Sequence, residues 1–308
     1  MTPALTPRIA ALMTLPPLMW AGNAVVGRLM VGEVPPLALS ALRWSLAALI
    51  LAPLALRVWR DGAAIRAAWP YLLAIGTLGV GSFNALQYMA LETSTPINVT
   101  LINASMPVWM MAVGALVYRE RMARRQLLGA LLSLAGVATV MSRGAWASLL
   151  QVQFVVGDVY MLVAVIGFAV YSWMLVRPPP SMRAPRRPDW DWAAFLFVQS
   201  LFGLLVAGGA AAVEASMASH APIAWSNPLV WAALAYLAIG PSIIAYRCWG
   251  LGVARAGPAL AAFFANLSPL FAALLSAWLL HEWPRPYHGV AFALIVAGIL
   301  VSMPRPSR

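Results

Sequence analysis

Long apolar runs, separated by short breaks that contain charged residues or prolines, fill almost the whole chain. A helix needs about 20 mostly apolar residues to cross the hydrocarbon core of a bilayer. The runs predict an all-α integral membrane protein with ten transmembrane helices and no soluble domain. These helices are 8–30, 36–57, 69–91, 95–118, 125–143, 154–177, 190–213, 229–253, 258–280 and 287–303, with ends accurate to a few residues.

The composition supports a membrane protein. Of the 308 residues, 62% are hydrophobic and 9% are charged, whereas soluble domains carry about 25% charged residues. The net charge of +11 does not indicate a nucleic-acid partner, because the arginines lie in small groups between apolar runs and form no single basic face. We therefore expect the lipid bilayer and a small-molecule substrate as partners, and a monomer or weak homo-oligomer. The start of the chain has the pattern of a retained first helix and not of a cleaved signal peptide.

Arginines predict the orientation in the membrane. With the N-terminus inside, segments facing the cytoplasm hold 15 of the 20 arginines and segments facing outward hold 3. The other two, Arg43 and Arg247, fall within predicted helices. Positively charged loops stay on the cytoplasmic side. We expect a multi-pass protein of the inner (cytoplasmic) membrane with both termini in the cytoplasm.

Two distant stretches resemble each other at an offset of 162 residues. The first, 105–121, reads SMPVWMMAVGALVYRER, and the second, 267–283, reads LSPLFAALLSAWLLHEW. A proline and a glutamate coincide in both copies, Pro107 with Pro269 and Glu120 with Glu282. The copies are five predicted helices apart, which is an odd number, so the second copy enters the membrane inverted. The chain is predicted to consist of two inverted five-helix repeats, 1–150 and 151–308.

Inverted repeats are common in transporters, where they form two similar faces that open alternately on either side. A duplication that serves packing alone is the alternative. The two halves, each with a fourth helix that ends in a Glu thirteen residues after a proline, resemble the drug/metabolite transporter superfamily and its EamA-type ten-helix exporters. The similarity is closest to bacterial inner-membrane exporters of aromatic amino acids and other metabolites. This resemblance implies export of small metabolites.

An enzyme is not expected. The chain has no HExxH or GxSxG motif and no pairing of its single cysteine, Cys248, with a histidine. The three histidines are too scattered for a metal site, and no cofactor is expected.

Polar side chains inside predicted helices are costly, so they face a cavity or another helix. Arg43 lies seven residues past Pro36, about 10 Å along its helix at 1.5 Å per residue. Its guanidinium could bind the carboxylate of an amino acid in a bidentate manner. A tie to backbone carbonyls near the proline is the alternative. Arg247 is closer to the end of its helix, where a long side chain can reach the interface.

Two helices at equivalent places of the repeat carry contrasting pairs. Tyr246 and Trp249, three residues apart, share a helix face and correspond to Asn84 and Gln87 at the offset of 162. This predicts a cavity with one polar and one aromatic wall, although ordinary packing is the alternative. Interhelical hydrogen bonds are the alternative for the asparagines. The other candidates for substrate binding are Trp20, Asn23, Tyr88, Asn98, Asn103, Trp109, Tyr171 and Asn266.

Two further features predict structural roles. Glu120 and Glu282 precede the last helix of each half, where a carboxylate can bind the free amides of the first turn. Small residues at intervals of four predict close packing of these last helices, through Gly129 and Ser133 in one and Gly289, Ala293 and Ala297 in the other.

The charges within the predicted helices indicate the substrate. None of the nine carboxylates is central, and Asp158 comes closest, whereas two arginines lie inside helices. The sequence therefore predicts an exporter of small zwitterionic metabolites, amino acids including aromatic ones, that works by alternating access around a midplane cavity. The alternatives are a proton-coupled exporter of cationic drugs, which would use a deep acidic residue, and a channel for small solutes.

Overall fold

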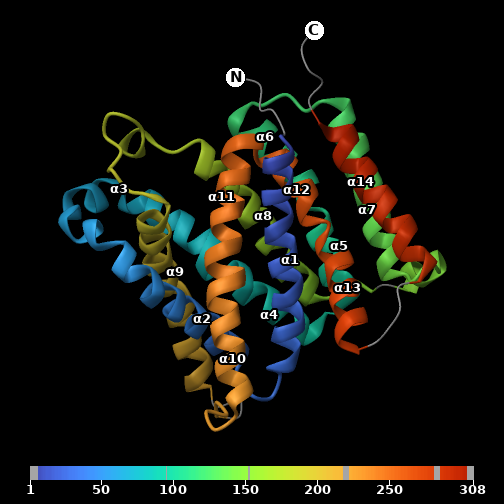
Figure 1. Cartoon of the computed structure of the whole chain (residues 1–308), viewed down its shortest axis with the longest axis horizontal. Coiled ribbons are helices and arrows are strands. Elements are labelled where there is room, and N and C mark those ends of the chain that lie inside the picture. The colour runs from blue at the N-terminus through green and yellow to red at the C-terminus, as the bar shows by residue number, and fades with distance from the viewer. Residues whose placement is uncertain (1–5, 95, 152, 218–221, 281–284, 304–308) are drawn as a thin grey trace.

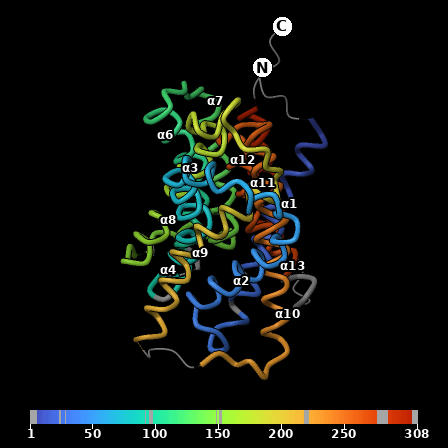
Figure 2. Tube along the Cα trace, turned by 90° about the vertical axis from the view of Figure 1, so that its left-hand side faces the viewer, coloured from blue at the N-terminus to red at the C-terminus, as the bar shows by residue number. Residues whose placement is uncertain are grey.

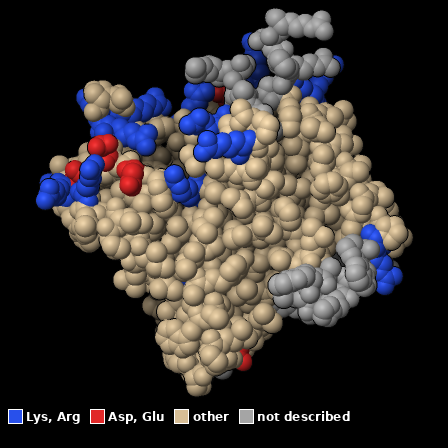
Figure 3. Space-filling model, in the orientation of Figure 1, with Lys and Arg blue, Asp and Glu red and all other residues tan. Residues whose placement is uncertain are grey.

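The computed structural model describes residues 6–94, 96–151, 153–217, 222–280 and 285–303. All regular secondary structure in these ranges is helical. The helices form one bundle, in which α1 begins and α14 ends at the same end of the molecule (Figures 1 and 2). Basic side chains gather at that end (Figure 3). This distribution agrees with the positive-inside pattern, and the orientation in a membrane stays a prediction.

The elements follow one another in the same general order in the two halves. In the first half they are α1 (Pro7–Leu29), α2 (Pro36–Leu51), η1 (Ala52–Leu54), η2 (Leu56–Arg60), α3 (Gly62–Ile75), η3 (Gly76–Gly81), α4 (Phe83–Thr93), α5 (Pro96–Ala104), α6 (Met106–Tyr118), α7 (Arg124–Met141) and η4 (Trp146–Gln151). In the second they are α8 (Val156–Val176), η5 (Pro180–Met182), α9 (Trp192–Ser216), α10 (Pro228–Leu237), η6 (Ala238–Ile244), α11 (Ala245–Ala256), α12 (Pro258–Ala265), α13 (Ser268–Leu280) and α14 (Pro286–Ser302). Six of the α-helices begin at a proline, whose missing N–H costs nothing in a first turn.

The structure confirms an all-α protein with many membrane-spanning helices. Within the described ranges, seven helical stretches are long and apolar enough to cross a bilayer. The pair α5 and α6, bent by 42° at its junction, makes an eighth. Helix α14 is apolar but has only 17 residues. The count of ten therefore stays a prediction.

Two π-helical segments interrupt the long helices at equivalent places. Segment η3 joins α3 to α4, and η6 joins α10 to α11. They begin at Gly76 and Ala238, which are separated by the offset of the sequence repeat. A π segment carries i→i+5 hydrogen bonds and shifts the register of the helix, and in η6 it surrounds Pro241. The shared break supports the two-repeat interpretation.

Helices α7 and α14 pack with their backbones in contact. A Cβ atom on Gly129 would lie 2.6 Å from the carbonyl oxygen of Gly298, and the converse distance is also 2.6 Å. The prediction of close packing through Gly129 is therefore correct. The predicted face of α14 is wrong: Gly289 and Ala293 are exposed. The contact runs instead through Ala291, Ile295 and Gly298, because small residues occur on two faces of α14 and spacing alone does not select one.

The predicted role of Glu120 is also wrong. Its carboxylate forms an ion pair with Arg177, at the end of α8. At the start of α7, the side chain of Gln126 takes the capping role instead: the Ala123 N–H donates to Gln126 Oε1 at 3.0 Å. Glu282 lies outside the described residues.

Candidate functional site

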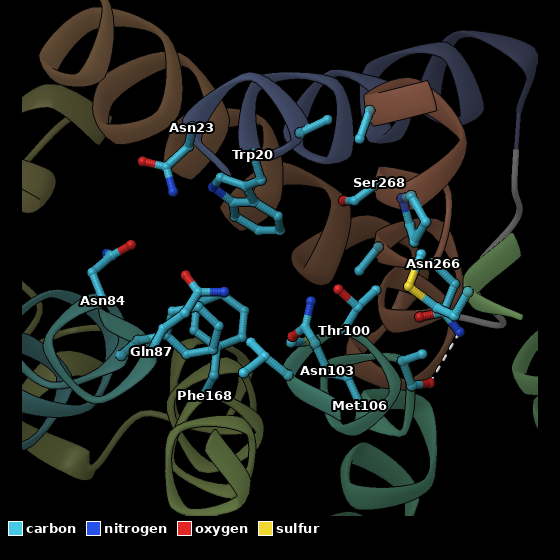
Figure 4. Close-up of a pocket in the computed structure, with 18 of the residues that line it drawn as sticks. Trp20, Asn23, Asn84, Gln87, Thr100, Asn103, Met106, Phe168, Asn266 and Ser268 are labelled. Carbon is cyan, nitrogen blue, oxygen red and sulfur yellow. Dashed lines mark hydrogen bonds between the residues drawn. The ribbon is translucent and has the colours of Figure 1, made fainter. Parts of the chain in front are cut away.

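A cavity of about 180 Å³ lies inside the bundle, between α1, α4, α5, α8, α11 and the junction of α12 and α13. In Figure 4, Asn23 and Asn84 lie on the left, Asn103 lies near the middle and Asn266 lies on the right. Seven of the thirteen predicted binding residues line it, namely Trp20, Asn23, Asn84, Gln87, Asn103, Tyr246 and Asn266.

Arg43 does not line this cavity but lies directly behind it. The side chain is 1% exposed and makes three hydrogen bonds. Nε donates to Ser242 Oγ at 3.0 Å. Nη1 donates to Asn23 Oδ1 at 2.8 Å and to Asn84 Oδ1 at 3.2 Å. No ion pair to Arg43 occurs among the described residues. A buried cation without a counter-ion is costly, so this end of the cavity favours an anion.

The guanidinium also orients the two asparagines. Arg43 can only donate hydrogen bonds, so both amides must turn their Oδ1 atoms toward it. The Nδ2 groups of Asn23 and Asn84 are left for the cavity, because neither makes a hydrogen bond within the described residues. The cavity therefore has N–H donors with a positive charge behind them, which is an arrangement suited to a carboxylate.

Aromatic rings form one wall. The Trp20 ring centroid lies 5.8 Å from that of Phe168 and 5.4 Å from that of Trp249. The Tyr246 hydroxyl donates to the carbonyl oxygen of Gly79, inside η3. Trp249 is held by a 3.1 Å hydrogen bond from Nε1 to Ser172 Oγ. We call Trp20, Phe168, Tyr246 and Trp249 the aromatic layer.

A second cavity of about 820 Å³ lies at the end of the bundle where α1 begins. Glu120, Arg121, Arg177 and Arg255 line it. Trp249 is one helical turn from Val253, which also lines this second cavity. Along α11, Trp249 therefore lies between Tyr246, which lines the first cavity, and Val253; the two cavities share no lining residue.

Five other predicted binding residues point elsewhere. Asn98 Nδ2 donates to Asp158 Oδ2 at 3.0 Å and to the Gln153 carbonyl at 2.9 Å. Trp109 Nε1 donates to Ser105 Oγ at 3.1 Å. The remaining three are Tyr171, which accepts a hydrogen bond from Gln199, Trp249 in the aromatic layer, and Tyr88, whose buried hydroxyl has no partner within the described ranges.

The buried carboxylates are occupied away from the cavity. Asp158 is 1% exposed and accepts hydrogen bonds from Ser94 and Asn98 and from the Val155 N–H. Glu214 accepts from the backbone N–H groups of Leu37 and Ala38, at 3.1 and 2.9 Å, and so caps α2. The described lining of the 180 Å³ cavity contains no Asp or Glu.

Several residues at the cavity were not predicted from the sequence. Phe168 and Thr100 line the cavity, and Ser242 supports Arg43 from η6. Only Ser242 had a signal, namely a hydroxyl next to Pro241 in an apolar run. Arg247 packs its guanidinium carbon 4.2 Å from the ring centroid of Trp192, the first residue of α9.

Comparison with known proteins gives consistent matches over nearly the whole chain. A family model for the EamA-like transporter family matches residues 8–142 and 155–303. A transporter of Archaeoglobus fulgidus is 28% identical over 94% of this chain and 96% of its own length. The aromatic amino acid exporter YddG of Ancylobacter novellus is 24% identical over 88% of each chain. A probable amino-acid metabolite efflux pump of Salmonella typhimurium is 26% identical over 93% of this chain and 91% of its own. A solved crystal structure shares the fold, with a TM-score of 0.73 at 24% identity and 96% coverage of both chains.

Proposed function

Because this chain belongs to the EamA-like transporter family, we propose that it exports small zwitterionic metabolites, amino acids including aromatic ones, across the cytoplasmic membrane. The family is one of transporters and not a class of enzymes. The names of two relatives, an aromatic amino acid exporter and an amino-acid metabolite efflux pump, support this substrate class.

The observation that carries the proposal is the buried Arg43 and its two asparagines. A cation in a low-dielectric interior is stabilised most by an anion with which it shares hydrogen bonds. No carboxylate of the described chain occupies that place, whereas Asn23 and Asn84 direct N–H donors into the cavity. The substrate carboxylate fills this role. Arg43 acts through the two amides and by its charge.

The aromatic layer accounts for the aromatic part of the substrate class. Aromatic rings associate favourably with other rings in edge-to-face or offset arrangements. Trp20, Phe168 and Tyr246 present such surfaces to the cavity. An aromatic side chain of the substrate packs there while its carboxylate faces Asn23 and Asn84.

Alternating access is the mechanism that the two cavities support. The halves 1–150 and 151–308 are inverted repeats, and the termini face the cytoplasm. In the present conformation the aromatic layer contributes Trp20, Phe168 and Tyr246 to the lining of the 180 Å³ cavity, and this cavity shares no lining residue with the 820 Å³ cavity. Exchange of the two conformations between the halves closes one cavity and opens the other.

The two alternatives have less support. Proton-coupled export of cationic drugs needs an acidic group in the cavity, and the described lining residues include none. A channel needs a continuous path through the protein, whereas the two cavities share no lining residue.

The test is transport by the purified protein in liposomes. Radiolabelled phenylalanine should exchange across the bilayer, and unlabelled amino acids should compete with it. A cationic dye should not compete, and a pH gradient should not be required. Dye transport that depends on a pH gradient, without phenylalanine exchange, would replace the proposal with the cationic-drug alternative.

A further inference from the structure

Two half-helices end at the cavity, at matching breaks. Helix α5 ends at Ala104, three residues before Pro107, and α12 ends at Ala265, four residues before Pro269. Proline has no N–H, so the carbonyls four residues earlier, on Asn103 and Ala265, lose their helical partners. Neither carbonyl accepts another backbone hydrogen bond within the described residues. Both residues line the cavity.

Asn266 adds a side-chain acceptor at the same place. Its Nδ2 donates to the Ala104 carbonyl at 3.1 Å, drawn as the dashed line in Figure 4, and to Ser133 Oγ at 2.8 Å. A carbonyl can only accept, so the NH₂ group of the amide must face it. The Oδ1 atom is therefore directed away from these partners. Asn266 is 2% exposed, and the surface that it retains lies in the cavity.

Electrostatics at this end are the reverse of those near Arg43. The last turns of α5 and α12 bring the negative ends of two helix dipoles to the cavity. The Oδ1 atom of Asn103 is buried and has no hydrogen-bond partner in the part of the chain that is described. Figure 4 shows Asn266 on the opposite side of the cavity from Asn23 and Asn84, with Asn103 nearer the middle. One end of the cavity thus has donors and a cation, and the other has oxygen acceptors.

We propose that the ends of α5 and α12, with Asn266, form a subsite for the ammonium group of the transported amino acid; this inference rests on the proposed function. A primary ammonium has three N–H donors. The Asn103 and Ala265 carbonyls and Asn266 Oδ1 supply three acceptors without a full negative charge. The subsite therefore selects substrates with a protonated amine and orients them relative to the carboxylate end.

The test restores the missing N–H groups. In Pro269→Ala and Pro107→Ala, the new backbone N–H pairs with the Ala265 or Asn103 carbonyl and removes one acceptor from the cavity. Inhibition of phenylalanine exchange by phenylalanine and by 3-phenylpropanoate, which lacks the amine, gives two affinities for each variant. We expect each variant to weaken phenylalanine about tenfold, the size of one hydrogen bond to a charged group. The affinity for 3-phenylpropanoate should not change.

The matched control is Pro70→Ala, in an exposed position inside α3 and away from the cavity. It should alter neither affinity. Asn266→Ala is the second variant on the subsite and should likewise weaken phenylalanine selectively, with thermal unfolding measured to show that it folds.

Equal losses for both ligands, or no loss in any folded variant, would overturn the ammonium subsite while phenylalanine transport by the unaltered protein still supports the proposed function. A sodium requirement that shifts in the proline variants would assign the acceptors to sodium and also overturn the subsite. No phenylalanine exchange by the unaltered protein would overturn the proposed function itself.

Discussion

Helices α4 and α11 occupy places 162 residues apart in the sequence repeat, yet the side chains that they turn toward the cavity differ in polarity. Each follows a π-helical segment, η3 or η6, in the same repeat register. Helix α4 then presents Asn84 and Gln87 beside Phe83, whereas α11 presents only Tyr246 among the described lining residues. The backbone irregularity is shared and the side chains have diverged. If the halves are repeats, as we propose, the shared backbone forms the cavity and differences in side chains between the halves make it chemically asymmetric.

The proline breaks differ in a second way. The α5–α6 junction is bent by 42°, whereas α12 continues into α13 as one span from Pro258 to Leu275. Asn266, on the straighter side, donates to the Ala104 carbonyl on the bent side. Only one half supplies this amide. A sequence repeat therefore predicts where two breaks lie but not how far each one opens.

The strongest test of the comparison asks whether the halves are inverted at all. Ala63 and Ser226 are exposed residues in corresponding turns, before or at the start of α3 and α10. On a background without Cys248, a membrane-impermeant thiol reagent applied to intact cells should label Ser226→Cys fully and Ala63→Cys not at all. Labelling of both from the outside would contradict the inverted repeat and the cytoplasmic termini.

Removal of Arg43 should weaken carboxylate binding at the polar end of the cavity. Arg43→Ala leaves Asn23 and Asn84 free to rotate and removes the charge behind them, so we expect kcat/KM for phenylalanine to fall about 100-fold, as for hydrogen bonds to a charged group. Inhibition by 2-phenylethylamine, which has no carboxylate, should remain. Arg43→Lys should recover little, because an ammonium cannot replace the planar fork.

The control for Arg43 is Arg57→Ala, whose side chain is exposed and pairs only at the surface with Asp189. It should transport normally. If Arg43→Ala weakened phenylethylamine as strongly as phenylalanine, the residue would act on the fold and not on the carboxylate end.

The two π segments should differ in their tolerance of a methyl group. A Cβ on Gly79, in η3, would lie 2.6 Å from the Tyr171 ring, and we expect Gly79→Ala to destabilise the protein by about 1–3 kcal/mol through overpacking. A Cβ on Gly240, in η6, would meet the flexible Met19 side chain at 3.1 Å, so Gly240→Ala should cost less. Thermal unfolding in detergent measures both. Equal losses would show that the segments are packed alike.

The smallest effect is expected from the hydroxyl that connects the two copies. Tyr246→Phe keeps the ring but removes the hydrogen bond to the Gly79 carbonyl. Loss of a neutral hydrogen bond costs about 1 kcal/mol, which corresponds to roughly fivefold in transport rate if the bond stabilises this conformation. The affinity for phenylalanine should stay constant. A large change in affinity would place the hydroxyl in direct contact with substrate.

Much of the fold could be predicted because its signals are local. Apolar length predicts spans, and proline spacing predicts the breaks after α5 and α12. The π segments left almost no trace, since Gly76 and Ala238 both continue apolar helices and differ only in the hydrogen-bond register. The face of α14 was predicted wrongly, because Gly289, Ala293 and Ala297 are all small, whereas the face in contact with α7 includes the larger Ile295.

The site was harder to predict because its contacts join distant parts of the chain. The depth of Arg43 indicated burial, but its angular direction depends on how α2 packs, and Glu214 caps that helix from 176 residues away. Asn98 had the same polar signature as Asn103, yet Asp158 engages it. A polar residue in an apolar run indicates a partner, and only the fold decides whether that partner is substrate or protein.

The hydrogen bond between Asn266 and Ala104 joins two positions that are 162 apart, so each is the counterpart of the other in the repeat. Under a twofold rotation, only points on the axis coincide with their own images. If the halves are inverted repeats, as we propose, a bond between counterparts must lie close to the axis that relates them. When the halves exchange conformations, the cavity walls on the two sides of the axis exchange their positions. A bond on the axis stays in place. The amine of the substrate, held beside this stationary point, would remain bound while the rest of the cavity turns from one side of the membrane to the other.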